Sequence, residues 1–252
     1  CLALYHFFKN ENNVNIISPN QYTDILNFLP GSESVLVFDN EKEKSTNLLK
    51  NADIIFTLDF NSLSRARNLS NLISKSSAKI IMIDHHENPD KYADIMISDS
   101  KMSSTCEMVY NLIESLDSKA FNSEIANCLY TGIMTDTGSF RYPATTPATH
   151  RAIAHLIETG ASGTEIHQRI YDSASFSRLK LLGLTLANLK QIPNLPVVYM
   201  TLSQKELNSC DYKKGDTEGF VNYGLSLEGI VFSCIMIENE SEGIIKMSFR
   251  SQ

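Results

Sequence analysis

The chain has 252 residues, of which 42% are hydrophobic and 20% are charged, and its formal net charge is −7. This length suits one large domain or two modest ones, and the composition is ordinary for a soluble globular protein. The negative charge argues against a broad basic surface for nucleic acid, but it does not exclude a small anionic substrate held by metal ions in a cleft.

The cysteines and the apolar runs indicate the cellular compartment in which the protein works. The five cysteines show no CxxC spacing, and their odd number fits a reducing cytoplasm better than a disulfide framework. No apolar stretch reaches the roughly 18 to 20 residues needed to span a bilayer, and no signal peptide is recognisable. We therefore expect a cytoplasmic protein without a membrane span.

Short β-rich runs alternate with helical patterns over the first half of the chain, which is typical of a parallel sheet with crossover helices. Several of these runs are apolar on both faces, as expected for strands that helices bury on both sides. The expected strands are 14–18, 34–38, 53–59, 79–84 and 94–98. The predicted fold class is α/β, with a parallel-sheet N-terminal domain that carries helices on both faces.

Helix signals lie between and after these strands. Ser104 and Glu107 form a capping-box pattern before one helix, and Pro147 and Gly160 mark the start and the end of another. The expected helices of this half are "CLALYHFF" at the start of the chain, a short one around Leu69–Ile73, and the segments 104–116, 123–134 and 147–159.

A shift in composition divides the chain. Residues 175–191 predict a long helix, and the two prolines of "IPNLP" indicate a linker. Strands at 197–202, 230–237 and 244–249 and helices at 203–207 and 217–227 are expected after it. We predict a domain at 1–174, a connecting helix and linker at 175–193, and a smaller α+β domain at 194–252.

Polar residues end two neighbouring strands of the expected sheet. Asp59 closes one strand, and Asp84, followed directly by His85 and His86, closes the next. Ligands gather at the carboxyl ends of strands in an open α/β sheet, so these groups should point at one crevice. A third acid, Asp136, follows an apolar helix in "MTDTGSFRY", among small residues that allow close approach of the backbone to a ligand.

Carboxylates with imidazoles and no nearby thiolate suit manganese, magnesium or iron better than a structural zinc site. A pair of such ions about 3.5–4 Å apart can generate a hydroxide and hold the oxygens of a phosphate. Taken alone, a strand-ending aspartate is most often a cap of a helix or turn. The Asp-His-His triplet, with Asp-Thr-Gly-Ser downstream, favours the metal site over that alternative.

Five segments, spread over nearly all of the chain, carry a resemblance to a known family: "FTLDFNSLSRARNL", "IDHHENP", "YTGIMTDTGSFRYPATTPATHRAIAHLIETGA", "GDTEGFVNYGLSLEGI" and "SFRS". The chain resembles the DHH phosphoesterase family with a DHH-associated C-terminal domain. Within that family it is similar to the small oligoribonucleases of the NrnA type, also called nanoRNases or 3′-phosphoadenosine-5′-phosphate (pAp) phosphatases.

The resemblance implies a role for each matching residue. Asp59 would bridge two manganese ions, His85 and Asp136 would bind metal, and His86 would approach the scissile phosphate. Asp84 would orient the histidines beside it, a support that metal-bound imidazoles commonly need.

The same resemblance implies that the C-terminal domain grips the nucleotide and that the protein is a homodimer. Ser248 and Arg250 of "SFRS" are then candidates for the substrate phosphate, because the planar guanidinium matches phosphate oxygens. A lone arginine on a strand is usually solvated, which is the alternative for Arg250. Arg65, in the loop after Asp59, could reach the site, and a place on a helix surface is an equal alternative.

The sequence departs from the family pattern at both ends. The family's first motif, a His-x-x-Pro-Asp-x-Asp run that normally supplies one histidine and two aspartate ligands, does not precede Cys1. The Gly-rich motif with a histidine does not follow "SFRS". We therefore expect the parent protein to be an enzyme of which the sequence contains part, with three of the expected metal ligands.

The function that we expect is metal-dependent hydrolysis of short oligoribonucleotides to mononucleotides, and also of pAp to AMP. Two divalent metal ions are expected, manganese first and magnesium as the alternative. A second possibility is a phosphodiesterase for cyclic dinucleotides or their linear products. Pyrophosphatase and exopolyphosphatase relatives share the triplet, but "GDTEGFVNY" and "SFRS" favour the nucleotide branch. From another class, the chain could be a non-catalytic nucleotide-binding module.

Overall fold

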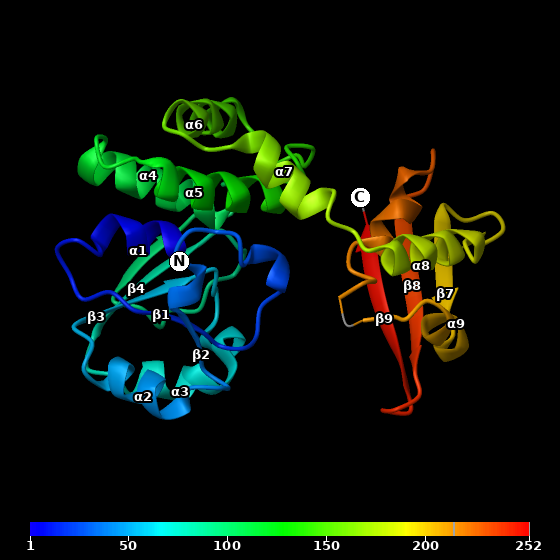
Figure 1. Cartoon of the computed structure of the whole chain (residues 1–252), viewed down its shortest axis with the longest axis horizontal. Helices are drawn as coiled ribbons and strands as arrows, with labels where there is room; N and C mark the ends of the chain where they lie inside the picture. The colour runs from blue at the N-terminus through cyan, green and yellow to red at the C-terminus, as the bar shows by residue number, and fades with distance from the viewer. Residues whose placement is uncertain (214, 252) are drawn as a thin grey trace. The chain divides into compact units, whose positions relative to one another are not determined.

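A computed structural model of the protein describes residues 1–213 and 215–251. The chain divides into two compact units, Cys1–Ile170 and Tyr171–Gln252 (Figure 1). Across the described ranges, no helix combines the length and the apolar character that crossing a bilayer requires.

The first unit holds the five strands that the sequence predicts in this half. β1 pairs with β2, and β3, β4 and β5 follow one another in a second sheet, with every pairing parallel. The strands are β1 (Ile16–Ser18), β2 (Val35–Val37), β3 (Ile54–Leu58), β4 (Lys79–Asp84) and β5 (Ile95–Ser98). They form two parallel sheets, and β1 and β3 do not pair with each other within the described residues.

Helices cover both faces of the β3–β4–β5 sheet, which confirms the predicted α/β class (Figure 1). On one face, Ile55 packs in a core with Leu49 of α2 and Ile73 of α3. On the other face, Ile83 packs with Ile133 of α5 and with α4. The helices of this unit are α1 (Leu2–Phe8), α2 (Lys42–Lys50), α3 (Ser70–Ser74), α4 (Thr105–Asp117), α5 (Ser123–Asp136), α6 (Pro147–Glu158) and α7 (Gly163–Tyr171), with 3-10 turns at Asp24–Leu26, Ser32–Ser34 and Leu63–Leu69.

The start of α4 differs from the predicted capping box. The Ser104 hydroxyl accepts a hydrogen bond from the Glu107 N–H at 3.0 Å, as expected of a cap. The Glu107 carboxylate does not complete the box. It is buried, and it accepts hydrogen bonds from the hydroxyls of Ser103 and of Thr149 on α6. The glutamate therefore ties α4 to α6 instead of capping its own helix.

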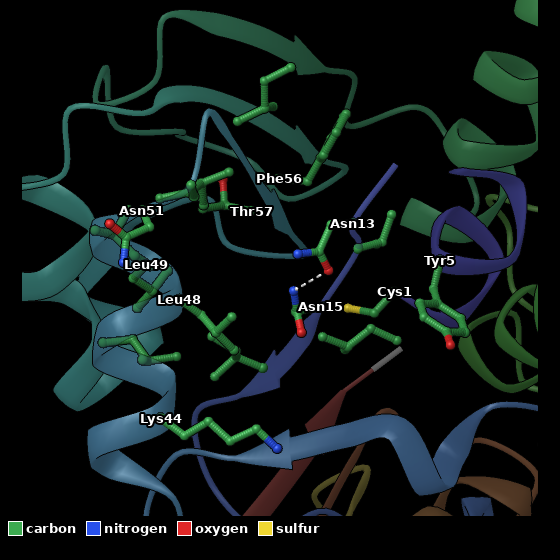
Figure 2. Close-up of a pocket in the computed structure, with 18 of the residues that line it drawn as sticks. Cys1, Tyr5, Asn13, Asn15, Lys44, Leu48, Leu49, Asn51, Phe56 and Thr57 are labelled. Atoms are coloured by element: carbon green, nitrogen blue, oxygen red, sulfur yellow. Dashed lines mark hydrogen bonds between the residues drawn. The ribbon is translucent and has the colours of Figure 1, made fainter. Parts of the chain in front are cut away.

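A cavity of about 1100 Å³ lies between the two sheets of this unit (Figure 2). Ile16 and Ile17 of β1 and the residues of β3 line it, together with side chains of α1 and α2. Leu58 and Phe60, on either side of Asp59, also line it.

The second unit is a four-stranded sheet with short helices. The strand order is β6-β7-β8-β9, with β7 and β8 parallel and the outer pairs antiparallel. Leu181, Met200, Phe220 and Ile235 share its core. The elements are α8 (Phe176–Ala187), β6 (Lys190–Gln191), β7 (Val197–Leu202), α9 (Gln204–Ser209), a 3-10 segment (Phe220–Ser226), β8 (Phe232–Asn239) and β9 (Ile244–Ser251).

Two details of this unit differ from the sequence-based expectation. The segment 175–193, which we expected to connect two domains, contains α8 and β6, and Leu181 of α8 is fully buried in the core of the second unit. The helix expected at 217–227 is a 3-10 segment, Phe220–Ser226, that starts after a left-handed glycine, Gly219. Packing against the sheet thus makes the expected connector part of the second unit.

Candidate metal and active site

The candidate site lies at the carboxyl ends of β3 and β4. These strands are parallel neighbours in which Leu58 stands opposite Ile83. Asp59 follows β3, and its N–H donates to the Ile83 carbonyl at 3.0 Å, so the pairing continues one step past the strand. Asp84 is the last residue of β4. Parallel strands thus bring the two aspartates to one edge of the sheet, where ligands bind in such folds.

Asp59 leaves the strand in a left-handed conformation, with φ 69°. Aspartate is one of the few non-glycine residues that adopt this region readily. Its side chain is 55% exposed, and its Oδ1 accepts a hydrogen bond of 2.7 Å from the hydroxyl of Thr105 on α4. One carboxylate oxygen is therefore held by the protein while the group as a whole remains accessible.

Asp84 is completely buried and serves His86. Its Oδ1 accepts the backbone N–H of His86 at 2.7 Å, and its Oδ2 lies 3.1 Å from the ring Nδ1 of the same residue. A carboxylate only accepts hydrogen bonds, so Nδ1 of His86 carries the hydrogen and Nε2 keeps its lone pair. Asp84 therefore orients His86 rather than facing solvent itself.

His85 is oriented by a backbone carbonyl. Its Nδ1 lies 3.2 Å from the carbonyl oxygen of Met102, which can only accept. The hydrogen is then on Nδ1, and the lone pair of Nε2 is directed into the site. This Nε2 lies 3.2 Å from Oδ2 of Asp136 and 3.8 Å from Oδ1 of Asp59.

These atoms fit a divalent cation. Two ligand atoms that each stand about 2.1 Å from one ion, at coordination angles of about 90–109°, are about 3.0–3.4 Å apart. The distance of 3.2 Å from Nε2 of His85 to Asp136 falls in this range, and the distance of 3.8 Å to Asp59 is longer. Ligand atoms of Asp59, His85 and His86 also lie within 4.8 Å of one another. Carboxylates with imidazole suit manganese or magnesium better than a structural zinc site.

The electrostatic surroundings of Asp136 also favour a bound cation. Burial raises the pKa of the Asp136 carboxyl above its usual value, the neighbouring His85 lowers it, and the Asp59 carboxylate raises it again. Desolvation and a like charge both disfavour the ionised form, and a nearby cation favours it. A divalent ion between these carboxylates would offset their repulsion.

The sequence-based site residues fall into two groups. Asp59, Asp84, His85, His86 and Asp136 come together at one edge of the first unit. Arg65 is exposed in the 3-10 segment after Asp59, where its guanidinium donates to Oδ1 of Asn61 at 3.3 Å. Ser248 and Arg250 lie exposed on β9 of the second unit.

Sequence reasoning missed two groups that orient the candidate ligands through hydrogen bonds. They are the Thr105 hydroxyl on Asp59 and the Met102 carbonyl on His85. Thr105 lies inside the segment "SSTCE", whose pattern predicts only the start of a helix. Spacing carried no sign that the start of this helix would reach the strand ends.

Fold and site together define an α/β protein with a carboxylate–imidazole centre at the edge of a parallel sheet. A family model described as DHH family, N-terminal domain, matches residues 1–133, so the chain belongs to the DHH family. A crystal structure of an exopolyphosphatase-related protein from Bacteroides fragilis is 38% identical to it. That match has a TM-score of 0.96 and covers 100% of this chain and 74% of the other.

Two curated relatives carry the name bifunctional oligoribonuclease and PAP phosphatase NrnA. The protein of Bacillus subtilis is 35% identical over 123 residues, which are 47% of this chain and 38% of that protein. The protein of Thermus thermophilus is 30% identical over 173 residues, which are 69% of this chain and 51% of that protein. The matched region thus spans about half of these relatives or less.

Proposed function

We propose that the protein is a metal-dependent phosphoesterase that hydrolyses short oligoribonucleotides to mononucleotides and also converts pAp to AMP. The observation that carries this proposal is the position of Nε2 of His85 between Asp136 and Asp59, at 3.2 and 3.8 Å. Two relatives named for these activities support the choice of substrate. Another name among the similar proteins, exopolyphosphatase-related, belongs to the same broad chemistry of phosphate hydrolysis.

In this proposal Asp59, His85 and Asp136 hold divalent metal, with manganese first and magnesium as the alternative. Such an ion supplies positive charge that binds phosphate oxygens and lowers the pKa of water. Two ions are proposed, and Asp59, His85 and Asp136 would be among their ligands.

The remaining residues of the edge act on the substrate. His86, with Nδ1 bound to the buried Asp84, would donate from Nε2 to an oxygen of the scissile phosphate when its ring carries both hydrogens. Asp84 keeps that ring in one orientation and one tautomer. Hydrogen bonds that are already oriented toward developing charge lower a reaction barrier without further rearrangement.

The substrate's remaining phosphates are assigned to arginine and serine side chains. Ser248 and Arg250 are two positions apart on β9, so they share one face of the strand. Arg65 follows Asp59 on an exposed turn. The guanidinium groups suit phosphate because of their planar, bidentate geometry.

Release of mononucleotides from an RNA dinucleotide, with and without Mn²⁺, tests the proposal on the complete protein. Wild type should release mononucleotides only with the metal, and Asp136→Ala should lose most of this activity. Glu158→Ala, at an exposed position at the end of α6, is the matched control and should keep it. A cyclic dinucleotide offered in parallel tests the alternative substrate. Nucleotide binding with no hydrolysis of any of these would favour the non-catalytic module.

A further inference from the structure

One hydroxyl contacts the oxygen of Asp59 that faces both histidines. Thr105 Oγ1 lies 2.7 Å from Asp59 Oδ1, and the two residues are 46 positions apart in the chain. The same Oδ1 lies 3.8 Å from Nε2 of His85 and 3.8 Å from Nδ1 of His86. The hydrogen bond therefore acts on the atom around which the candidate ligands gather.

The backbone of Asp59 is fixed, but its side chain needs a contact of this kind to be fixed as well. The backbone is fixed by the bond from its N–H to the Ile83 carbonyl. The carboxylate stands beyond the strand end and is 55% exposed, so water alone would leave it several rotamers. A hydrogen bond to one carboxylate oxygen selects a single orientation.

Thr105 is well suited to hold that orientation. It is the first residue of α4 and only 8% exposed, and a β-branched side chain has few accessible χ1 rotamers. The turn around it is anchored on both sides, by the Ser104 cap and by the buried Glu107, which binds Ser103 and Thr149. The start of α4 is therefore a firm support.

We infer that Thr105 is a positioning residue, whose hydroxyl fixes the Asp59 carboxylate in the orientation that binds a divalent cation. This inference rests on the proposed function, since it concerns the same site. The Met102 carbonyl, three residues earlier, fixes the ring of His85 in the same manner. One short segment, Met102–Thr105, thus sets the direction of two ligands that come from two different strands.

The test is Mn²⁺ affinity, measured by isothermal titration calorimetry on the complete protein. Thr105→Val keeps the shape of the side chain and removes the hydroxyl, and Thr105→Ser keeps the hydroxyl and removes the methyl group. Groups that support a metal ligand contribute about 10- to 100-fold in affinity. Thr105→Val should therefore bind Mn²⁺ about tenfold more weakly or worse, and Thr105→Ser should stay close to wild type.

Two controls separate positioning from folding. Thr46→Val removes a hydroxyl that binds the Lys42 carbonyl on α2 and should leave Mn²⁺ affinity unchanged. The melting temperature of metal-free Thr105→Val should stay near that of wild type, because the carboxylate that loses its donor is accessible to water. If Thr105→Val does not fold, Thr105→Ala is compared with Thr105→Ser at a temperature where both are folded.

The outcomes are distinct. If wild type binds no Mn²⁺, the proposed function fails and the role of Thr105 falls with it. If wild type binds Mn²⁺ and Thr105→Val binds it equally well, the role of Thr105 alone is overturned. Equal weakening in Thr105→Ser and Thr105→Val would show that packing of the methyl group, and not the hydroxyl, matters, which also overturns it.

Discussion

The Nε2 atom of His85 lies 3.2 Å from Oδ2 of Asp136, although His85 follows a strand and Asp136 is the last residue of a helix. The Met102 carbonyl holds a hydrogen on Nδ1 of His85. In the neutral ring, the lone pair of Nε2 is therefore directed at the Asp136 carboxylate. Two electron-rich atoms so close together are stabilised by a cation or by a proton.

Mn²⁺ binding and stability should depend on pH through Asp136. Burial raises the pKa of its carboxyl above the ordinary value of 3.8, so the folded chain holds this proton more tightly than the unfolded chain does. In the metal-free protein this contribution to stability is full below pH 3.8 and is lost as the pH rises through the raised pKa. Mn²⁺ competes with the proton, so its affinity should rise over the same window.

Thermal unfolding across that pH range, with and without Mn²⁺, measures the effect of Asp136. The variant Asp136→Asn cannot titrate there, so its metal-free stability should fall less than that of wild type as the pH rises. Its gain from Mn²⁺ should be small at every pH. Identical pH profiles for wild type and variant would contradict the assignment.

Asp84→Asn should destabilise the fold and disturb His86. The buried carboxylate accepts two hydrogen bonds with its two oxygens, and an amide offers only one acceptor in their place. Leaving a buried donor without an acceptor costs about 1–3 kcal/mol. Urea unfolding should show this loss. The exposed control Glu158→Gln should stay within about 0.5 kcal/mol of wild type.

Gly132→Ala should weaken the packing of α4 against α5. A Cβ at this position would stand 2.1 Å from Sγ of Cys106 and 2.9 Å from its Cβ, so the two helices would have to move apart. Overpacking of this kind costs about 1–3 kcal/mol. Replacing Cys106 with alanine in the same chain removes the sulfur and should restore part of the loss in urea unfolding.

Gly183 is the matched control for that substitution. It also lies inside a helix, α8, but nothing stands within 4 Å of an added Cβ. Gly183→Ala should therefore stabilise its unit by up to about 1 kcal/mol, as the helix propensities of the two residues imply. A loss of stability at both glycines would mean that the clash with Cys106 is not the cause at Gly132.

The amino-acid pattern by itself determined the strands of the first half and three residues of the site. Apolar runs bounded by turns identify β3 and β4, and the residues that follow such runs must stand at strand ends. Because parallel neighbours run in the same direction, Asp59, Asp84 and His85 are brought to one edge by local structure and pairing alone. This part of the site needs no knowledge of distant packing.

Only the tertiary structure decided the rest. The division of the first five strands into two sheets, the inclusion of α8 in the second unit and the contact of Thr105 with Asp59 all depend on how elements far apart in sequence pack. A threonine after a serine in a helix-start pattern looks like part of a cap. Its contact with Asp59 exists only because the packed core places the start of α4 beside the end of β3, 46 residues away in sequence. The periodicity of a single segment does not predict a contact over that separation.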